Sequence, residues 1–300
     1  MHARIYRSIP VRLIEVDLGD PLPRHLPWSD VVIDVCTPTT VHGETLAWGY
    51  TQGVRQFVVE KPVAPDASAW RRLLGTMPDA QLFVVHSYLF SEAFRIACDA
   101  MPDARDIVIT FTKDRRDDDQ RGRGAGPDGR LPHLLHIEGP HQVAMALAIA
   151  PKFRVGHAAF LAYGSRGHER SSPLAMAIAL LDGSGRRALL ATGLHSQPQR
   201  RLQLCDGASR QVVAHFATNP QLIAEVHEYN GSGHVRTLFS GRDDLLRRTL
   251  QCGLEGLSTG SVPRGATAGF AESVLSLIDD ACRFAEGENP TTIPCAAALA

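Results

Sequence analysis

The N-terminal third of the chain alternates short apolar runs with a segment of helical length. Four runs have the length and β-branched content of buried strands, at residues 11–17, 30–39, 58–62 and 81–86. Residues 40–53, between the second and third runs, have the length of a helix and end at a glycine. Because parallel strands are joined by such crossovers, this order predicts an α/β domain with a parallel sheet.

Beyond residues 103–107 the pattern changes, and short strands alternate with turns rather than with helices. Two hairpins are predicted, one with strands at residues 174–181 and 187–195 and the other with strands at residues 201–205 and 210–216. Two helices, at residues 242–257 and 265–286, are predicted to close the chain. Hairpins of this kind build a mostly antiparallel sheet, so the second part of the chain is predicted to be an α+β domain.

The composition is that of an ordinary globular chain. Of its 300 residues, 44% are hydrophobic, an ordinary share for a globular protein. A chain of this length is longer than a single hydrophobic core usually supports, which favours two domains, at residues 1–104 and 105–300. The net charge of −1 gives no basic surface for nucleic acid or an anionic membrane, and no apolar run approaches the roughly 20 residues of a membrane-spanning helix. The six scattered cysteines suggest neither a zinc site nor a disulfide framework and favour a reducing cytoplasm.

Residues 58–62, Val-Val-Glu-Lys-Pro, end a predicted strand in a lysine between an acid and a proline. Ligands of parallel α/β sheets bind at the carboxyl ends of the strands, so Lys61 is placed where it can meet a substrate. A solvated lysine before a turn is the plainer interpretation of the same residues.

Three motifs occur in order along this part of the chain: Cys36-Thr37-Pro38 with His42 shortly after, Glu60-Lys61-Pro62, and the strand that runs to His86-Ser87-Tyr88. Together they resemble the N-terminal half of the Gfo/Idh/MocA oxidoreductases, the family of glucose-fructose oxidoreductase and inositol dehydrogenase. The resemblance implies a Rossmann-type dinucleotide-binding domain followed by a substrate domain with an open, mostly antiparallel sheet. It also implies a homo-oligomer formed through that C-terminal sheet.

In that family a lysine, an aspartate and a histidine form a proton-transfer group beside the reacting carbon. The resemblance matches Lys61 to the lysine and His141 to the histidine. The acids that flank the histidine do not match, because Ile137 and Ala144 stand in their places. Glu138, displaced by one residue, is the remaining candidate for the orienting acid.

The resemblance also implies a cofactor, NAD or NADP. Asp17 would accept hydrogen bonds from ribose hydroxyls and so favours NAD. The residues expected beside the nicotinamide are Thr37, Pro38, His42, Glu60, Lys61 and His86. Pro38 and His42 can equally serve to shape the turn and the helix that follows it.

The glycine-rich turn that holds the pyrophosphate in such sites should precede the ribose-binding acid by roughly 20 residues. Counting back from Asp17 passes Met1, and residues 2–10 look like the end of the helix that would follow this turn. Two explanations are open. A start codon assigned too far downstream is favoured here, because losing a central strand would expose the edges of the sheet; a real loss would leave the protein unable to hold NAD in the usual way.

The expected function is hydride transfer between a nicotinamide cofactor and a carbinol, carbonyl or imine carbon of a small polar substrate, in a biosynthetic pathway. The altered acids near His141 keep imine reduction open as a rival. A cofactor-free relative with a binding or regulatory role is the rival from outside the enzymes. Residues 113–130, rich in charge and glycine, are predicted to form a solvated loop, with a lid over an anionic substrate as the alternative.

Overall fold

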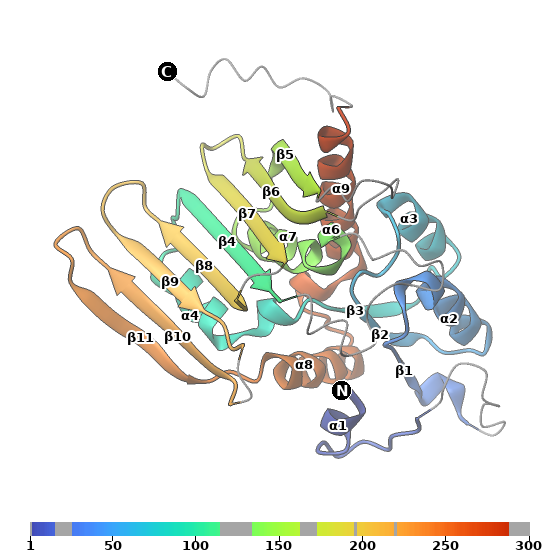
Figure 1. Ribbon diagram of the computed structural model, residues 1–300. Helices are drawn as coiled ribbons and strands as arrows, with labels where there is room; N and C mark the ends of the chain where they lie inside the picture. Colours follow the sequence, from blue (N-terminus) through green and yellow to red (C-terminus); the bar gives the residue numbers. More distant parts are fainter. Residues whose placement is uncertain are drawn as a thin grey trace. The chain divides into compact units, whose positions relative to one another are not determined.

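The computed structural model describes residues 2–15, 26–114, 134–162, 173–194, 197–218 and 221–287 (Figure 1). By the contacts among its residues the chain forms two compact units. The first unit contains Met1–Glu92 and Asp244–Ser273, and the second contains Ala93–Asp243 and Val274–Ala300. The division into domains 1–104 and 105–300 stays a prediction. Most of the charged loop at residues 113–130 lies outside the described residues.

The first unit is built on a parallel sheet with the strand order β1-β2-β3. Its strands are β1 (Val32–Val35), β2 (Gln56–Glu60) and β3 (Gln81–Val85), and the connecting helices are α2 (Thr39–Thr51) and α3 (Ala67–Gly75). The centre of β2 is fully buried, as expected for an apolar strand covered on both faces. The parallel sheet predicted from the strand, helix, strand pattern is therefore confirmed.

The core of this unit includes a helix from far along the chain. Helix α8 (Leu245–Thr259) packs on β3, where Gly253 allows close approach: a Cβ there would lie 2.9 Å from Cδ1 of Phe83. The short helix α1 (His2–Tyr6) adds Tyr6 to the same apolar cluster. Two 3-10 turns, η2 (Ser87–Phe90) and η3 (Arg264–Ala266), border this core, and a third, η1 (Trp28–Asp30), precedes β1.

The strand predicted at residues 11–17 is not formed over residues 11–15, which are irregular. Val11 and Ile14 are exposed, so this run does not bury the two faces that a central strand would bury. Asp17, expected to hold the ribose, lies outside the described residues. Within residues 2–10, which were expected to be helical, residues 2–6 form α1.

The second unit contains an eight-stranded sheet with the order β11-β10-β9-β8-β4-β7-β6-β5 (Figure 1). Its strands are β4 (Asp106–Lys113), β5 (Arg154–Ala162), β6 (Pro173–Leu181), β7 (Arg187–Leu194), β8 (Gln199–Cys205), β9 (Gln211–His215), β10 (Ile223–Tyr229) and β11 (Val235–Arg242). All paired neighbours are antiparallel except β4 and β7. Both predicted hairpins, β6–β7 and β8–β9, are confirmed.

The buried side chain of Gln142 links helix α7 (Gly139–Ile149) to this sheet by hydrogen bonds. Its Nε2 donates to the carbonyls of Ile109, at 3.0 Å, and Ala191, at 2.9 Å, on the parallel pair β4 and β7. Its Oε1 accepts from the Thr192 hydroxyl at 2.7 Å. Because each polar atom of the amide is bonded, the start of α7 is held in register with the sheet.

The remaining helices are α4 (Glu92–Ala100), α6 (Leu134–Ile137) and α9 (Ala268–Ala285). Within the described ranges, no helix combines the length and apolar character that crossing a bilayer requires.

Candidate functional site

The carboxyl edge of the parallel sheet collects most of the residues predicted to form a site. Thr37 follows β1, Glu60 and Lys61 lie at the end of β2, and His86 follows β3. These residues come from distant parts of the sequence, and parallel pairing brings their strand ends to one edge. This is the edge at which sheets of this type bind ligands.

His42 lies beneath the turn that follows β1. Its Nε2 is 2.6 Å from the carbonyl oxygen of Thr37, and its ring is buried. Burial lowers the pKa of His42, so a neutral ring donates Nε2–H to that carbonyl. With 1% of its surface exposed, His42 has no free face for a ligand and instead holds the turn that presents Thr37 and Pro38.

Thr37 carries a buried hydroxyl in this turn. Among the described residues, that oxygen has no hydrogen-bond partner. Pro38, the next residue, is exposed at the start of α2. A buried, unbonded hydroxyl costs free energy, so this position can receive a hydrogen-bonding group from a ligand.

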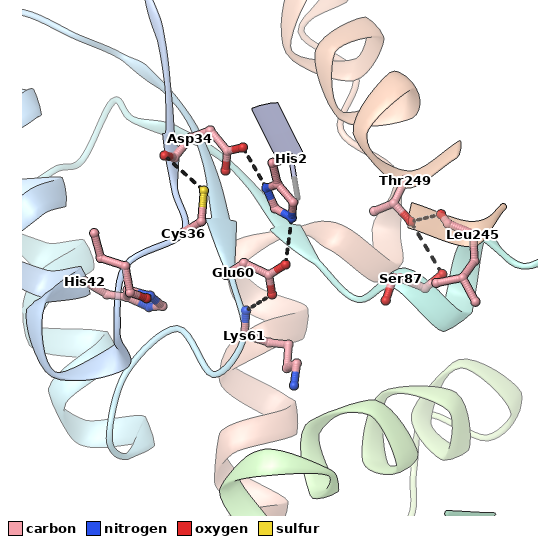
Figure 2. A network of polar contacts seen from close by, with 10 residues as sticks. His2, Asp34, Cys36, His42, Glu60, Lys61, Ser87, Leu245 and Thr249 are labelled. Atoms are coloured by element: carbon pink, nitrogen blue, oxygen red, sulfur yellow. Dashed lines mark hydrogen bonds and ion pairs between the residues drawn. The ribbon is translucent and has the colours of Figure 1, made fainter. Parts of the chain in front are cut away.

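Glu60 is bound by a histidine that the sequence interpretation did not select. His2 Nε2 lies 2.9 Å from Glu60 Oε1, and His2 Nδ1 lies 2.7 Å from Asp34 Oδ2 (Figure 2). Since a carboxylate only accepts, both ring nitrogens must donate, and His2 is an imidazolium. Burial disfavours this charge, but the hydrogen bonds to Asp34, Cys36 and Glu60 outweigh burial and raise the pKa of His2 to about 12.

Lys61 is held by its backbone to the same carboxylate. The Lys61 N–H donates to Glu60 Oε2 at 3.1 Å, while its side chain extends away from that carboxylate (Figure 2). Burial by itself would raise the pKa of Glu60, but the bond from His2 and the positive charge of Lys61 lower it below its usual range. Glu60 is therefore a carboxylate with both oxygens occupied.

Three side chains near this pair are of the types that bind metal ions. Ligand atoms of His2, Asp34 and Cys36 lie within 4.8 Å of one another. A metal ligand must offer a lone pair, however, and both nitrogens of His2 donate hydrogen bonds to carboxylates. In this arrangement the cluster is an ion triad, Asp34–His2–Glu60, rather than a metal centre.

His86 is buried behind the strand ends. Its ring meets Phe270 edge-on, with 5.6 Å between the ring centroids, and in the described part of the chain neither ring nitrogen has a hydrogen-bond partner. Burial, with the positive charge of Lys61 adding to it, lowers the pKa of His86 to about 4. The ring is therefore neutral near pH 7.

This buried ring predicts a loss of stability in acid. The unfolded chain protonates this histidine near pH 6.5, but the folded chain does so only near pH 4. Between these values the unfolded state binds more protons, so stability falls as pH falls, by about 3 kcal/mol. Denaturant unfolding at pH 4 to 7 should show this loss in the parent and not in His86→Phe. His234→Gln, at an exposed site, is the matched control; equal pH slopes for parent and His86→Phe would disprove the effect.

Glu138 in the second unit lies just before α7 and is buried. Its Oε1 is 3.2 Å from Lys113 Nζ and 3.4 Å from Arg200 Nη2. Arg200 stacks over Phe111, with Cζ 4.7 Å from the ring centroid, and donates to the Thr112 carbonyl at 2.7 Å. One carboxylate thus compensates two cations at the end of β4.

His141 lies in the first turn of α7, beside the same aromatic ring. The centroids of its ring and Phe111 are 6.3 Å apart. Glu138 is close to it in sequence, and its carboxylate pairs with the two cations. Lys61 belongs to the first unit, whereas His141 and Glu138 belong to the second.

Three residues that pair with the predicted site residues were not selected from the sequence: Asp34, His2 and Arg200. Asp34 could have been found, because an acid inside the apolar run Val-Val-Ile-Asp-Val must have a partner once buried. His2 carries no such signal, since nothing in its spacing links it to residue 34 or residue 60. Arg200 directly precedes the strand predicted at residues 201–205, and the sequence interpretation did not select it.

No protein-family model matches this chain, and no curated protein matches it. Among solved structures, this chain is similar to the 3-ketoreductase KijD10 from Actinomadura kijaniata, which was crystallised with TDP-benzene and NADP. The TM-score is 0.69 and the sequence identity 16%, and the alignment covers 84% of this chain and 77% of KijD10. It is also similar to the UDP-N-acetylglucosamine 3-dehydrogenase GnnA from Acidithiobacillus ferrooxidans: TM-score 0.70, 15% identity, covering 87% of this chain and 80% of that one. Both are Gfo/Idh/MocA oxidoreductases. The expected fold, a Rossmann-type parallel sheet followed by an α+β domain with a mostly antiparallel open sheet, is confirmed: this chain has the fold of those enzymes.

Proposed function

We propose that this protein is an oxidoreductase that transfers a hydride between a nicotinamide dinucleotide and a carbon of a small polar substrate. The observation that carries the proposal is the position of Lys61, at the carboxyl end of β2 beside a fully bonded carboxylate. An ammonium group there can give a proton to a substrate oxygen or stabilise negative charge on it. The fold shared with two oxidoreductases supports this assignment.

We infer that the substrate is a sugar attached to a nucleoside diphosphate, oxidised at a hydroxyl or reduced at a ketone. KijD10 was crystallised with a TDP compound, and GnnA is named for a UDP-linked sugar. A biosynthetic reaction on such a sugar is consistent with the expectation from the sequence. The imine and cofactor-free alternatives have no specific support among the described residues.

The residues after β1 fit a nicotinamide. The buried hydroxyl of Thr37 has no partner in the described residues, so it can bond to the carboxamide of that ring. Pro38, Glu60 and Lys61 would complete the surface beside it, and Asp17 stays the predicted partner of the ribose. When bound, the nicotinamide supplies or accepts the hydride.

The remaining chemistry is proton transfer by the chain's own residues. Lys61 is the proposed proton donor or acceptor, with Glu60 fixing its backbone. His141 is proposed as a second acid or base, since an imidazole titrates near neutral pH. Glu138, in this proposal, keeps its carboxylate for Lys113 and Arg200.

Calorimetric titration of the protein with NADPH and with NADH tests the proposal first. Micromolar binding of one of them is expected, which corresponds to about −8 kcal/mol. Thr37→Val, which removes the hydroxyl and keeps the shape, should weaken that binding about tenfold. The loaded protein should then oxidise NADPH or NADH when a TDP- or UDP-linked 3-keto sugar is added. No binding of either nucleotide would favour the cofactor-free relative.

The proposal includes two expectations from the sequence. A homo-oligomer formed through the eight-stranded sheet stays a proposal, which sedimentation can test. A cytoplasmic location also stays a proposal; it is supported by the five cysteines in the described residues, all of which are free thiols.

A further inference from the structure

A continuous line of polar contacts joins β1 to Lys61. His2 donates from Nδ1 to Asp34 Oδ2 at 2.7 Å and from Nε2 to Glu60 Oε1 at 2.9 Å (Figure 2). Glu60 Oε2 in turn accepts from the Lys61 N–H at 3.1 Å. All four residues belong to the first unit. The line therefore connects α1, β1 and the end of β2 without any residue of the second unit.

The two oxygens of Glu60 are engaged in opposite directions. One faces the His2 imidazolium and the other faces the backbone of Lys61. The side chains of His2 and Asp34 are 7% and 14% exposed, so little water competes for their bond. A charge-assisted hydrogen bond in such surroundings sets both the direction of a carboxylate and its effective charge.

We propose that His2 is a positioning residue for Lys61: anchored by Asp34, it fixes the Glu60 carboxylate against the Lys61 backbone and offsets its negative charge. This inference rests on the proposed role of Lys61 in proton transfer. It assigns a task to α1, a helix that the sequence interpretation treated only as the end of a longer helix.

The proposal has a definite electrostatic consequence. The groups that face His2 are Asp34, Glu60, Cys36 and the ring of Tyr6, and those that act on Lys61 include Glu60 and His86. Removing the charge of His2 leaves Glu60 with more uncompensated negative charge, which binds the Lys61 proton more tightly. Removing the charge of Glu60 has the opposite effect.

Three variants test whether the two charges shift the pKa of Lys61 in opposite directions: His2→Gln, Glu60→Gln and the double variant. The chain contains three lysines, Lys61, Lys113 and Lys152, so trace acetylation followed by peptide mass spectrometry resolves each one. The pH dependence of the acetylation rate reports the pKa of each amine in the intact protein. It requires neither cofactor nor turnover.

The expected result is a pair of opposite shifts. The pH midpoint of Lys61 acetylation should rise by about 0.5 to 1 unit in His2→Gln and fall by a similar amount in Glu60→Gln. The double variant should lie within about 0.3 unit of the parent, because an ion pair is replaced by a neutral pair. The exposed Lys152 is the internal control and should not move.

Shifts of the same sign in both single variants, or no shift in either, would overturn the inference, since a merely structural role does not produce opposite signs. If His2→Gln does not fold, His2→Asn takes its place; it removes the same imidazolium charge and should also raise the pKa of Lys61. An unchanged Lys61 pKa in a folded His2→Asn would equally overturn the inference.

Turnover then separates this inference from the proposed function. In an active preparation of His2→Gln, the pH profile of kcat should follow the Lys61 shift, while KM for the cofactor stays within about twofold. If acetylation shows the opposite shifts and no substrate turns over, the positioning role stands and the proposed function fails. If turnover depends on Lys61 and acetylation shows no shift, the proposed function stands and the positioning role fails.

Discussion

Lys61→Ala is expected to lower turnover by about 10²–10⁴-fold while the dissociation constant for NADPH or NADH changes by less than about threefold. The side chain contributes a proton and a positive charge at the strand end, and its removal leaves the Glu60 contacts with His2 and the backbone in place. Calorimetry measures the binding, and the absorbance of the reduced nicotinamide measures the turnover.

Two further variants sharpen that result. Lys61→Arg keeps the positive charge but cannot give up a proton near neutral pH, so activity that survives this change would assign Lys61 to charge stabilisation. Lys152→Ala, at an exposed site, controls for the general loss of a lysine. Unchanged turnover in Lys61→Ala would remove this residue from the mechanism.

Glu138→Gln is expected to destabilise the fold by about 3 kcal/mol. The change keeps the size of the side chain but removes the charge that compensates Lys113 and Arg200, whose side chains are each 15% exposed. Two like charges would then face each other in a largely desolvated place. Urea unfolding followed by circular dichroism measures the free energy, with Glu286→Gln, at an exposed site of the same unit, as the control.

A second substitution tests whether charge is the cause. Adding Lys113→Met to Glu138→Gln removes one of the two cations and should restore part of the lost stability. A loss below about 0.5 kcal/mol in Glu138→Gln would mean that solvent screens these pairs and that the cluster contributes little to the fold.

The motifs around Lys61 were predictable because they depend on local order. Residues 57–59 form an apolar run that must be buried, so the lysine after it had to emerge at the end of a strand. Parallel pairing then places Thr37 and His86 at the same edge. The sequence also predicted both hairpins, since turns of the Asp-Gly type separate their strands.

Prediction failed where partners are remote. The run at residues 11–17 has strand composition, yet residues 11–15 are irregular and its apolar side chains at Val11 and Ile14 are exposed. The return of α8 to the parallel sheet was also unforeseen, because its apolar face does not specify which sheet it will cover.

By itself the sequence determined the strand, helix, strand order at residues 30–62, the parallel character of the first sheet, the two hairpins and the emergence of Lys61 at a strand end. These follow from hydrophobic period and turn chemistry, which act over a few residues. Tertiary structure alone decided that His2 is an imidazolium between Asp34 and Glu60, and that Glu138 lies between Lys113 and Arg200. The charge state and direction of a buried side chain depend on the groups packed against it, and here those groups lie 25 to 62 residues away in the chain.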